Sequence, residues 1–175
     1  MLPNFVLIGF MGCGKSTIGR RLAGLTGHRF LDTDDAIADA SQKSIPDIFS
    51  QLGEEGFRDL EQQVVQDLIG IAGIVLSSGG GTILREPNRA ALKRIGIVVW
   101  LDAAPDTLFE RATRTGRRPL LNTPNPRETF DTLLAARRPL YAALSDVHFD
   151  STHTEQDDVA RKVLEEAMRF RSRRN

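Results

Sequence analysis

The sequence predicts an α/β domain in which a parallel sheet is covered by helices on both faces. Short apolar runs typical of buried strands alternate with longer segments whose apolar residues recur at helical spacing. Glycines or carboxylates follow three of these runs, and in an open parallel sheet the loops after the strands share one edge. The predicted strands are residues 5–8, 29–34, 74–77, 97–101 and 147–150.

The first of these strands leads into a glycine-rich loop. Residues 9–16 read GFMGCGKS and match the phosphate-binding pattern Gly-x-x-x-x-Gly-Lys-Ser/Thr, and a segment with helical spacing follows through residue 25. In this strand–loop–helix setting, backbone N–H groups and the helix dipole attract phosphate. Lys15 would reach the β- and γ-phosphates, and the Ser16 hydroxyl would ligate Mg²⁺. An ordinary glycine turn is the alternative, and the surrounding strand and helix argue against it.

Length and composition restrict the remaining possibilities. A chain of 175 residues is long enough for one domain, 1–175, and its 23 basic and 23 acidic residues create no global field that would attract nucleic acid or an anionic membrane. The single cysteine, Cys13, excludes an internal disulfide and is expected to be a small filler in the glycine loop. No apolar run approaches about 18 residues. We therefore expect a cytoplasmic protein that binds neither nucleic acid nor membrane. We also expect it to be a monomer.

Acidic residues end the second predicted strand. Side chains alternate along an extended segment, so Asp32 and Asp34 should point the same way, where one could support Mg²⁺ and the other accept a hydroxyl proton. Alternatively, Asp34 or Asp35 could be the N-cap of the next helix. The residues alone leave these two interpretations equally balanced.

Two helices are predicted next. The first is capped by Ser44 and ended by Gly53, and a longer one runs from about residue 54 to 71. Glu54 and Glu61 can both lie beside Arg58 on the second helix. This flanking could orient the guanidinium for a ligand, but most such charged groups simply lie on a solvated helix face, which is the favoured interpretation.

Three consecutive glycines follow the third strand. Gly79, Gly80 and Gly81 leave backbone amides open to a ligand at the binding edge of the sheet, although a flexible turn is an equally good explanation. A helix is expected at 88–94, and Trp100 on the fourth strand should belong to the core.

The remaining chain is expected to contain a flap and two helices. Residues 115–126 contain three prolines and resemble a loop with a function of its own. It could close Arg117 and Arg118 over a nucleotide, or simply expose them. A helix that follows should bend, or lose one bond, at Pro139, and a closing helix should give way to a frayed basic tail at 169–175. The three histidines lack ligand-like spacing.

Taken together, these residues resemble the shikimate kinases along nearly the whole chain. The motifs that carry the resemblance, in chain order, are the glycine loop continuing into Ser16-Thr17-Ile18-Gly19, Asp32-Thr33-Asp34, Gly53-Glu54 with Phe57-Arg58 and Glu61, Gly79-Gly80-Gly81, Arg118-Pro119-Leu120-Leu121, and Arg137-Arg138-Pro139-Leu140-Tyr141. The resemblance implies transfer of the ATP γ-phosphate to the 3-hydroxyl of shikimate. It also implies a three-layer P-loop kinase fold with sheet order 2-3-1-4-5, a substrate-binding segment near 33–61 and a lid near 112–126.

The resemblance also implies roles for individual residues. ATP would be bound by Gly12, Cys13, Gly14, Lys15, Ser16, Thr17, Arg114 and Arg118, and shikimate by Asp34, Arg58, Gly79, Gly80, Gly81 and Arg137. Lys15, Asp34 and Arg118 would be catalytic, and Ser16 with Asp32 would hold Mg²⁺. The lid is short, so the adenine-contacting arginine could be Arg111 or Arg114, and we prefer Arg114. Asp35 is an additional acid, interpreted as a helix-start residue.

Chemistry supports this assignment, because two arginines can grip the single carboxylate of shikimate while Asp34 and open amides bind its hydroxyls. One alternative is a different small-molecule kinase, such as a gluconate or nucleotide kinase. Another is a non-catalytic nucleotide-binding module, which would be expected to lack Lys15, Asp34 or Arg118, and all three are present.

Overall fold

The computed structural model describes residues 2–114, 119–154 and 156–174. Its strands form one five-stranded sheet of order β2-β3-β1-β4-β5, with every neighbouring pair parallel. The predicted α/β class and the order 2-3-1-4-5 are thus confirmed. The strands are β1 (Phe5–Ile8), β2 (Arg29–Asp32), β3 (Ile74–Ser77), β4 (Ile97–Asp102) and β5 (Val147–Asp150). The helices are α1 (Lys15–Thr26), α2 (Thr33–Ser41), α3 (Ile45–Asp67), α4 (Glu86–Ile95), α5 (Pro105–Arg114), α6 (Pro126–Leu144) and α7 (Gln156–Arg174), with 3-10 turns η1 (Thr82–Leu84) and η2 (Pro119–Leu121).

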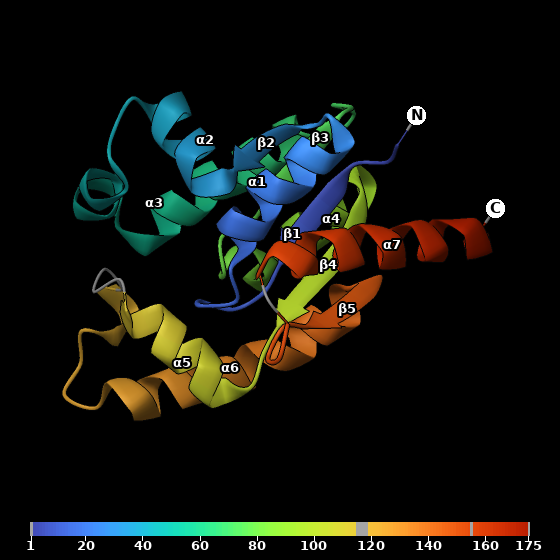
Figure 1. Cartoon of the computed structure of the whole chain (residues 1–175). Helices are drawn as coiled ribbons and strands as arrows, with labels where there is room; N and C mark the ends of the chain where they lie inside the picture. The colour runs from blue at the N-terminus through green and yellow to red at the C-terminus, as the bar shows by residue number, and fades with distance from the viewer. Residues whose placement is uncertain (1, 115–118, 155, 175) are drawn as a thin grey trace.

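The core lies on both faces of the central strands. Every residue of β1, β3 and β4 is buried, whereas the edge strands β2 and β5 are partly exposed. Helices α1 and α7 pack together on one face, and α4 and α6 contact the sheet from the other (Figure 1). Strands enclosed in this way must be apolar on both sides, which is why they are continuous apolar runs in the sequence. Trp100 belongs to this core, as predicted.

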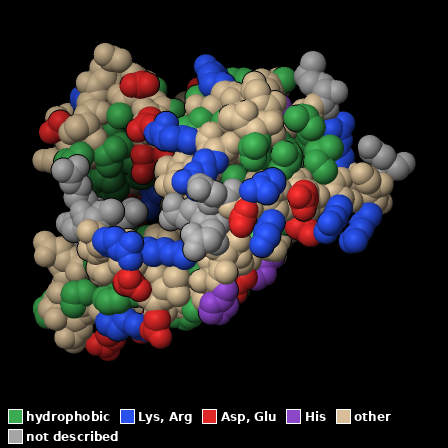
Figure 2. Space-filling model, in the orientation of Figure 1, with side chains coloured by type: hydrophobic (Ala, Val, Ile, Leu, Met, Phe, Trp, Pro, Cys, Tyr) green, Lys and Arg blue, Asp and Glu red, His purple; other side chains and the backbone are tan. Residues whose placement is uncertain are grey.

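The carboxyl ends of the strands point toward an opening between two protruding pairs of helices. Helices α2 and α3 lie above this edge in Figure 1 and α5 and α6 lie below it, with the loop after β1 between them. Figure 2 shows the surface hollowed there, with acidic side chains on the upper border and Lys and Arg side chains on the lower one. The fold therefore places groups of both charges around one cleft.

The second strand is shorter than predicted. Strand β2 ends at Asp32, and α2 begins at the next residue. Asp32 itself is the N-cap, because its Oδ1 accepts a 3.1 Å hydrogen bond from the N–H of Asp34. The expectation that Asp32 and Asp34 lie on one strand and point the same way was wrong, because Asp34 belongs to α2, and so was the choice of Asp34 or Asp35 as the cap. Capping satisfies a helix N–H that would otherwise lack a partner, and this favours the earlier helix start.

The predicted break at Gly53 is confirmed. Its φ of 68° and ψ of −172° interrupt the helical geometry within α3, and the positive φ favours glycine. The second part of α3 stops at Asp67 rather than at the predicted Ile71. Pro139 lies inside α6, and the helix continues past it to Leu144. Because proline has no N–H, one helical hydrogen bond is lost there without ending the helix.

The basic tail is more ordered than the sequence suggests. Helix α7 continues to Arg174 instead of fraying after Met168. Ala167 is buried, Phe170 packs against the main core, and Arg169 pairs with Glu166 at 2.7 Å. Ala167 and Phe170 extend the apolar face of α7 into the region that we expected to fray. In the part of the chain that the structure describes, no helix combines the length and apolar character needed to cross a membrane.

Candidate active site

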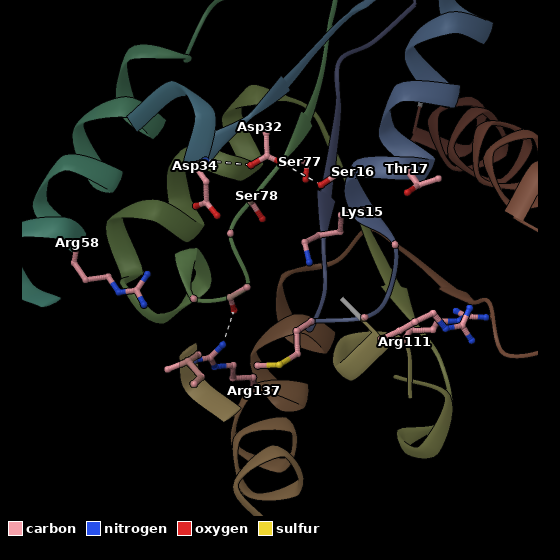
Figure 3. A pocket seen from close by; sticks show the side chains of 18 residues that line it. Lys15, Ser16, Thr17, Asp32, Asp34, Arg58, Ser77, Ser78, Arg111 and Arg137 are labelled. Carbon is pink, nitrogen blue, oxygen red and sulfur yellow. Dashed lines mark hydrogen bonds between the residues drawn. The ribbon is translucent and has the colours of Figure 1, made fainter. Parts of the chain in front are cut away.

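One cleft of about 600 Å³ at the carboxyl edge of the sheet gathers most of the predicted site residues. Figure 3 shows Asp34 and Arg58 on one side, Arg111 on the other, and Lys15 between them. The predicted residues that line it are Gly12, Gly14, Lys15, Ser16, Thr17, Asp32, Asp34, Arg58, Gly79, Gly80, Gly81, Arg114 and Arg137. Arg117 and Arg118 lie outside the described residues.

Several lining residues were not selected from the sequence, namely Met11, Ser77, Ser78 and Leu120. Ser77 and Ser78 form a polar pair between a buried strand and the three glycines, which is a signal that could have marked them. The Ser78 N–H and Oγ both donate to the carbonyl of Leu7, at 3.1 and 3.2 Å, and so join the end of β3 to β1.

The glycine loop has the conformation that its sequence requires. Gly12 has a φ of 85°, and a Cβ atom there would lie 2.2 Å from the carbonyl oxygen of Leu108, so only glycine fits. The loop ends at Gly14, with a φ of 87°, where α1 begins. Lys15 donates through Nζ to the carbonyl of Gly9 at 2.7 Å. Cys13 is 1% exposed, as expected of a small filler.

Ser16 and Asp32 offer a pair of oxygen ligands next to this loop. The Ser16 Oγ donates to Oδ2 of Asp32 at 3.1 Å and thereby links the first turn of α1 to the end of β2 (Figure 3). Mg²⁺ prefers oxygen ligands and often takes only one or two from the protein. The two side chains therefore fit the magnesium site that the resemblance implies.

Asp34 has an unusual carboxyl group. The side chain is accessible from the cleft, but the surrounding walls remove much of the bulk water. Burial, followed by the negative charges of Asp32 and Glu61, raises the pKa of Asp34 to about 6, and Lys15 opposes this rise. A carboxylate with this pKa is mostly ionised at neutral pH and is a stronger base than an ordinary aspartate.

Arg58 is held by its own helix. Its Nη1 donates to Oε2 of Glu61 at 2.9 Å, and its Nη2 contacts Glu54 at 3.5 Å. Only 14% of the Arg58 side chain and 1% of the Glu61 side chain are exposed, and Glu61 also accepts a 2.6 Å hydrogen bond from Thr82. The interpretation as a solvated helix face was therefore wrong.

Arg137 approaches the same region from α6. The residue is 8% exposed, and its Nη1 donates to the carbonyl of Gly80 at 3.3 Å (Figure 3). Added Cβ atoms would lie 3.6 Å from Arg137 at Gly80 and 2.6 Å from Arg58 at Gly81. The three glycines thus lie between the two guanidinium groups.

The backbone of the three glycines leaves two donors open. The N–H of Gly79 donates to Thr33 Oγ1 at 2.8 Å. The carbonyls of Gly79 and Gly81 accept from the N–H groups of Thr82 and Leu84 in η1, at 3.1 and 3.0 Å. Within the described part of the chain, the N–H groups of Gly80 and Gly81 have no hydrogen-bond acceptor. These two amides can therefore bind an oxygen in the cleft.

Two arginines of α5 line the other side. Arg111 donates to the Oγ and the carbonyl of Ser151, after β5, at 3.3 and 3.4 Å. Arg114 is 71% exposed and pairs with Glu110 at 2.7 Å. Arg111 is thus tied to a second segment of the fold, whereas the partner of Arg114 is one helical turn away on the surface.

A phosphate-binding glycine loop, a lysine at the centre of the cleft and a facing carboxylate are typical of phosphoryl transfer. The doubly covered parallel sheet with the loop after its central strand defines the class: a P-loop kinase of three-layer αβα architecture.

A model of the family described as "Shikimate kinase" matches residues 11–168. A shikimate kinase from Symbiobacterium thermophilum is 43% identical, over 93% of this chain and 94% of that protein. This chain belongs to the shikimate kinase family.

Solved structures agree with this placement. The shikimate kinase from Acinetobacter baumannii, solved in complex with shikimate, superposes with a TM-score of 0.90 and 40% identity, covering 97% of this chain and 94% of that one. A gluconokinase from Sinorhizobium meliloti reaches a TM-score of 0.62 at 20% identity, over 95% and 92% of the two chains, and shares the fold. The family therefore distinguishes this chain from other kinases of the same architecture.

Proposed function

We propose that this chain transfers the γ-phosphate of ATP to the 3-hydroxyl of shikimate, giving ADP and shikimate 3-phosphate. The observation that carries the proposal is the arrangement of one cleft, in which Lys15 lies between an acceptor side with Asp34 and Arg58 and a nucleotide side with Arg111. Donor and acceptor would meet at the lysine, which neutralises the charge of the transferring group.

The acceptor side matches the chemistry of a polyhydroxylated carboxylic acid. Arg58 and Arg137 would bind the carboxylate, since guanidinium groups form paired hydrogen bonds with this group. Arg137 makes a long bond from Nη1 to the carbonyl of Gly80, and its side chain lines the cleft, where it can meet the ligand. Asp34 and the open amides of Gly80 and Gly81 would bind ring hydroxyls.

The nucleotide side would hold the phosphates on the loop from Gly12 to Thr17, with the N-terminus of α1 behind them. For the adenine, the geometry favours Arg111 over our sequence-based preference, Arg114, because an arginine already held by Ser151 loses less conformational freedom on binding. Arg118 would reach the transferring phosphoryl group from the predicted lid at 112–126, and this role rests on sequence alone.

Magnesium would be bound by Ser16, with Asp32 supporting its water ligands, as their 3.1 Å contact allows. When bound, the ion would supply positive charge that offsets the negative charge of the phosphates. The other parts of the reaction depend on side chains of the protein.

In the transfer step, the shikimate hydroxyl oxygen forms a bond to the γ-phosphorus while the bond to the β,γ-bridging oxygen breaks and ADP leaves. The hydroxyl proton passes to the carboxylate of Asp34. Its raised pKa makes that carboxylate a suitable acceptor at neutral pH. Lys15 stabilises the charge on the phosphoryl oxygens during the transfer.

The direct test measures ADP release from MgATP by the purified chain with shikimate, gluconate, a nucleoside monophosphate or no acceptor. Release that depends on shikimate supports the proposal. Release that depends on another acceptor would identify a different small-molecule kinase, and binding of MgATP without turnover on any acceptor would indicate a non-catalytic module. Lys15→Ala is the negative control, because it removes the central cation.

We further propose that the chain acts in the cytoplasm as a monomer that binds neither nucleic acid nor membrane. The balanced charge of 23 basic and 23 acidic residues supports the absence of nucleic-acid and membrane binding, and the single, buried cysteine is consistent with a reducing compartment. Light scattering coupled to size-exclusion chromatography tests the monomer, for which the expected mass is 19.4 kDa.

A further inference from the structure

The carbonyl of Gly80 is held from behind by two side chains of α6. Tyr141 donates its hydroxyl to this oxygen at 2.6 Å, and Arg137, one helical turn earlier, donates at 3.3 Å. Tyr141 is fully buried, and its ring stacks on Trp100 with the centroids 6.1 Å apart. Packing in the core therefore fixes the position of the Tyr141 hydroxyl, which makes the shorter of the two bonds.

The planarity of the peptide bond transmits this contact to the cleft. In a trans peptide, the carbonyl of one residue and the N–H of the next point in opposite directions, and the described chain contains no cis peptide. Because α6 holds the Gly80 carbonyl, the Gly81 N–H must point away from α6. An added Cβ at Gly81 would lie 2.6 Å from Nη2 of Arg58, so the Cα at the far end of this peptide lies next to Arg58, which lines the cleft.

A segment of three glycines needs such an external constraint. Glycine has no Cβ, and the Gly80–Gly81 peptide can rotate at little steric cost. The flanking groups have other partners, because Gly79 donates its N–H to Thr33 on α2 and the Gly81 carbonyl accepts from Leu84. The Gly80 carbonyl, in contrast, is held only by α6 among the described residues.

We infer that the Tyr141 hydroxyl is a positioning group for the acceptor substrate. It sets the orientation of the Gly80–Gly81 peptide, so that the Gly81 amide faces the cleft beside Arg58. It also makes the shorter of the two bonds to the Gly80 carbonyl, so that this oxygen does not depend on Arg137 alone. The inference rests on the proposed function for the identity of the acceptor, and Tyr141 itself touches no substrate.

The kinetic test is Tyr141→Phe, which keeps the ring stacked on Trp100 and removes only the hydroxyl. We expect the KM for shikimate to rise about 5- to 20-fold, kcat to change by less than about threefold, and the KM for ATP by less than about twofold, because a ground-state contact to the acceptor alone is weakened. Thr26→Val is the control, since it removes a hydroxyl that donates to Leu22 at 2.8 Å within α1, away from the cleft. It should leave both KM values unchanged.

A second measurement does not depend on turnover. In amide NMR spectra of the protein without substrate, the Gly80 and Gly81 resonances should be sharp in the original chain and broadened or doubled in Tyr141→Phe, because the peptide samples a second orientation. If the original chain shows no turnover with shikimate, the proposed function fails, and the NMR comparison still tests the positioning role.

Two results would overturn the inference. One is a folded Tyr141→Phe variant whose KM for shikimate stays within about twofold of the original and whose Gly81 resonance is unchanged. The other is a loss that affects shikimate and ATP equally and follows the drop in Tm, because this pattern describes a general loss of stability.

Discussion

Arg58 donates a 2.9 Å hydrogen bond to Glu61 one turn later on α3, and the carboxylate of Glu61 is 1% exposed. Thr82, next to the three glycines, donates to the same carboxylate at 2.6 Å. Glu61 therefore fixes Arg58 relative to the glycine segment. A guanidinium held in place loses little conformational freedom when it binds an anion.

Replacing Arg58 should weaken binding of shikimate more than it slows turnover. We expect Arg58→Ala to raise the dissociation constant for shikimate about 30-fold or more, because a charged hydrogen-bonded partner is lost. Titration calorimetry measures this constant directly. Arg85→Ala is the matched control, since Arg85 contacts the same helix through Glu55 and Asp59 but does not line the cleft. Equal affinity in both variants would remove Arg58 from the acceptor site.

The raised pKa of Asp34 predicts the acid side of the pH–rate profile. Because the pKa lies at about 6, kcat/KM for shikimate should fall roughly tenfold per pH unit below pH 6 as the carboxylate becomes protonated. Asp34→Asn should lower kcat by at least about 100-fold and abolish this dependence in the residual activity. A profile that stays flat down to pH 4.5 would contradict a role for the ionised group.

The protonated form of Asp34, which is inactive, is the form that should favour the folded state. A carboxyl with a raised pKa binds its proton more tightly in the folded state, so its contribution to stability falls as the pH rises from about 4 to 6. The Tm of Asp34→Asn relative to the original chain should therefore increase between pH 4 and pH 7. A relative Tm that decreases over this range would show that the folded state favours the charged form.

Arg118 is predicted to act on the transition state. Arg118→Ala should lower kcat by two or more orders of magnitude while the dissociation constant for shikimate stays within about threefold, because the contact forms mainly as charge develops on the transferring phosphoryl group. Arg117→Ala, which removes the neighbouring charge, is the control. Parallel losses of binding and turnover in Arg118→Ala would argue against this role.

The two arginines of α5 can be distinguished by their effect on ATP. Arg111 is anchored to Ser151, whereas Arg114 is 71% exposed. We expect Arg111→Ala to raise the KM for ATP by about tenfold and Arg114→Ala by less than about twofold, since an exposed ion pair contributes little. The reverse ranking would support the adenine contact at Arg114.

Local sequence signals were enough to predict much of the fold. The loop from Gly9 to Ser16 and the break at Gly53 depend on backbone conformations that few residues adopt, and strands β3 and β5 have the predicted bounds. The extent of α7 was missed because the packing of Phe170 on the core involves segments far apart in the chain.

The site was only partly predictable for the same reason. Asp32 and Asp34 were expected in the cleft and both line it. They do not lie on one strand, however, because Asp32 caps α2 and Asp34 belongs to that helix. Helical spacing on α3 could not tell that Glu61 would be buried against Thr82, which turns an apparently solvated Arg58 into a fixed one. Tyr141 was noted only as the last residue of the motif at 137–141, and only the fold shows that its hydroxyl reaches Gly80.

The most direct test of the proposed reaction identifies the atom that receives the phosphate. The chain is incubated with MgATP and shikimate, and the product is examined by phosphorus–proton correlation NMR. The proposed mechanism predicts one organic phosphate whose phosphorus couples to the proton on carbon 3 of the ring. Coupling to a proton on another carbon, or release of inorganic phosphate alone, would contradict it.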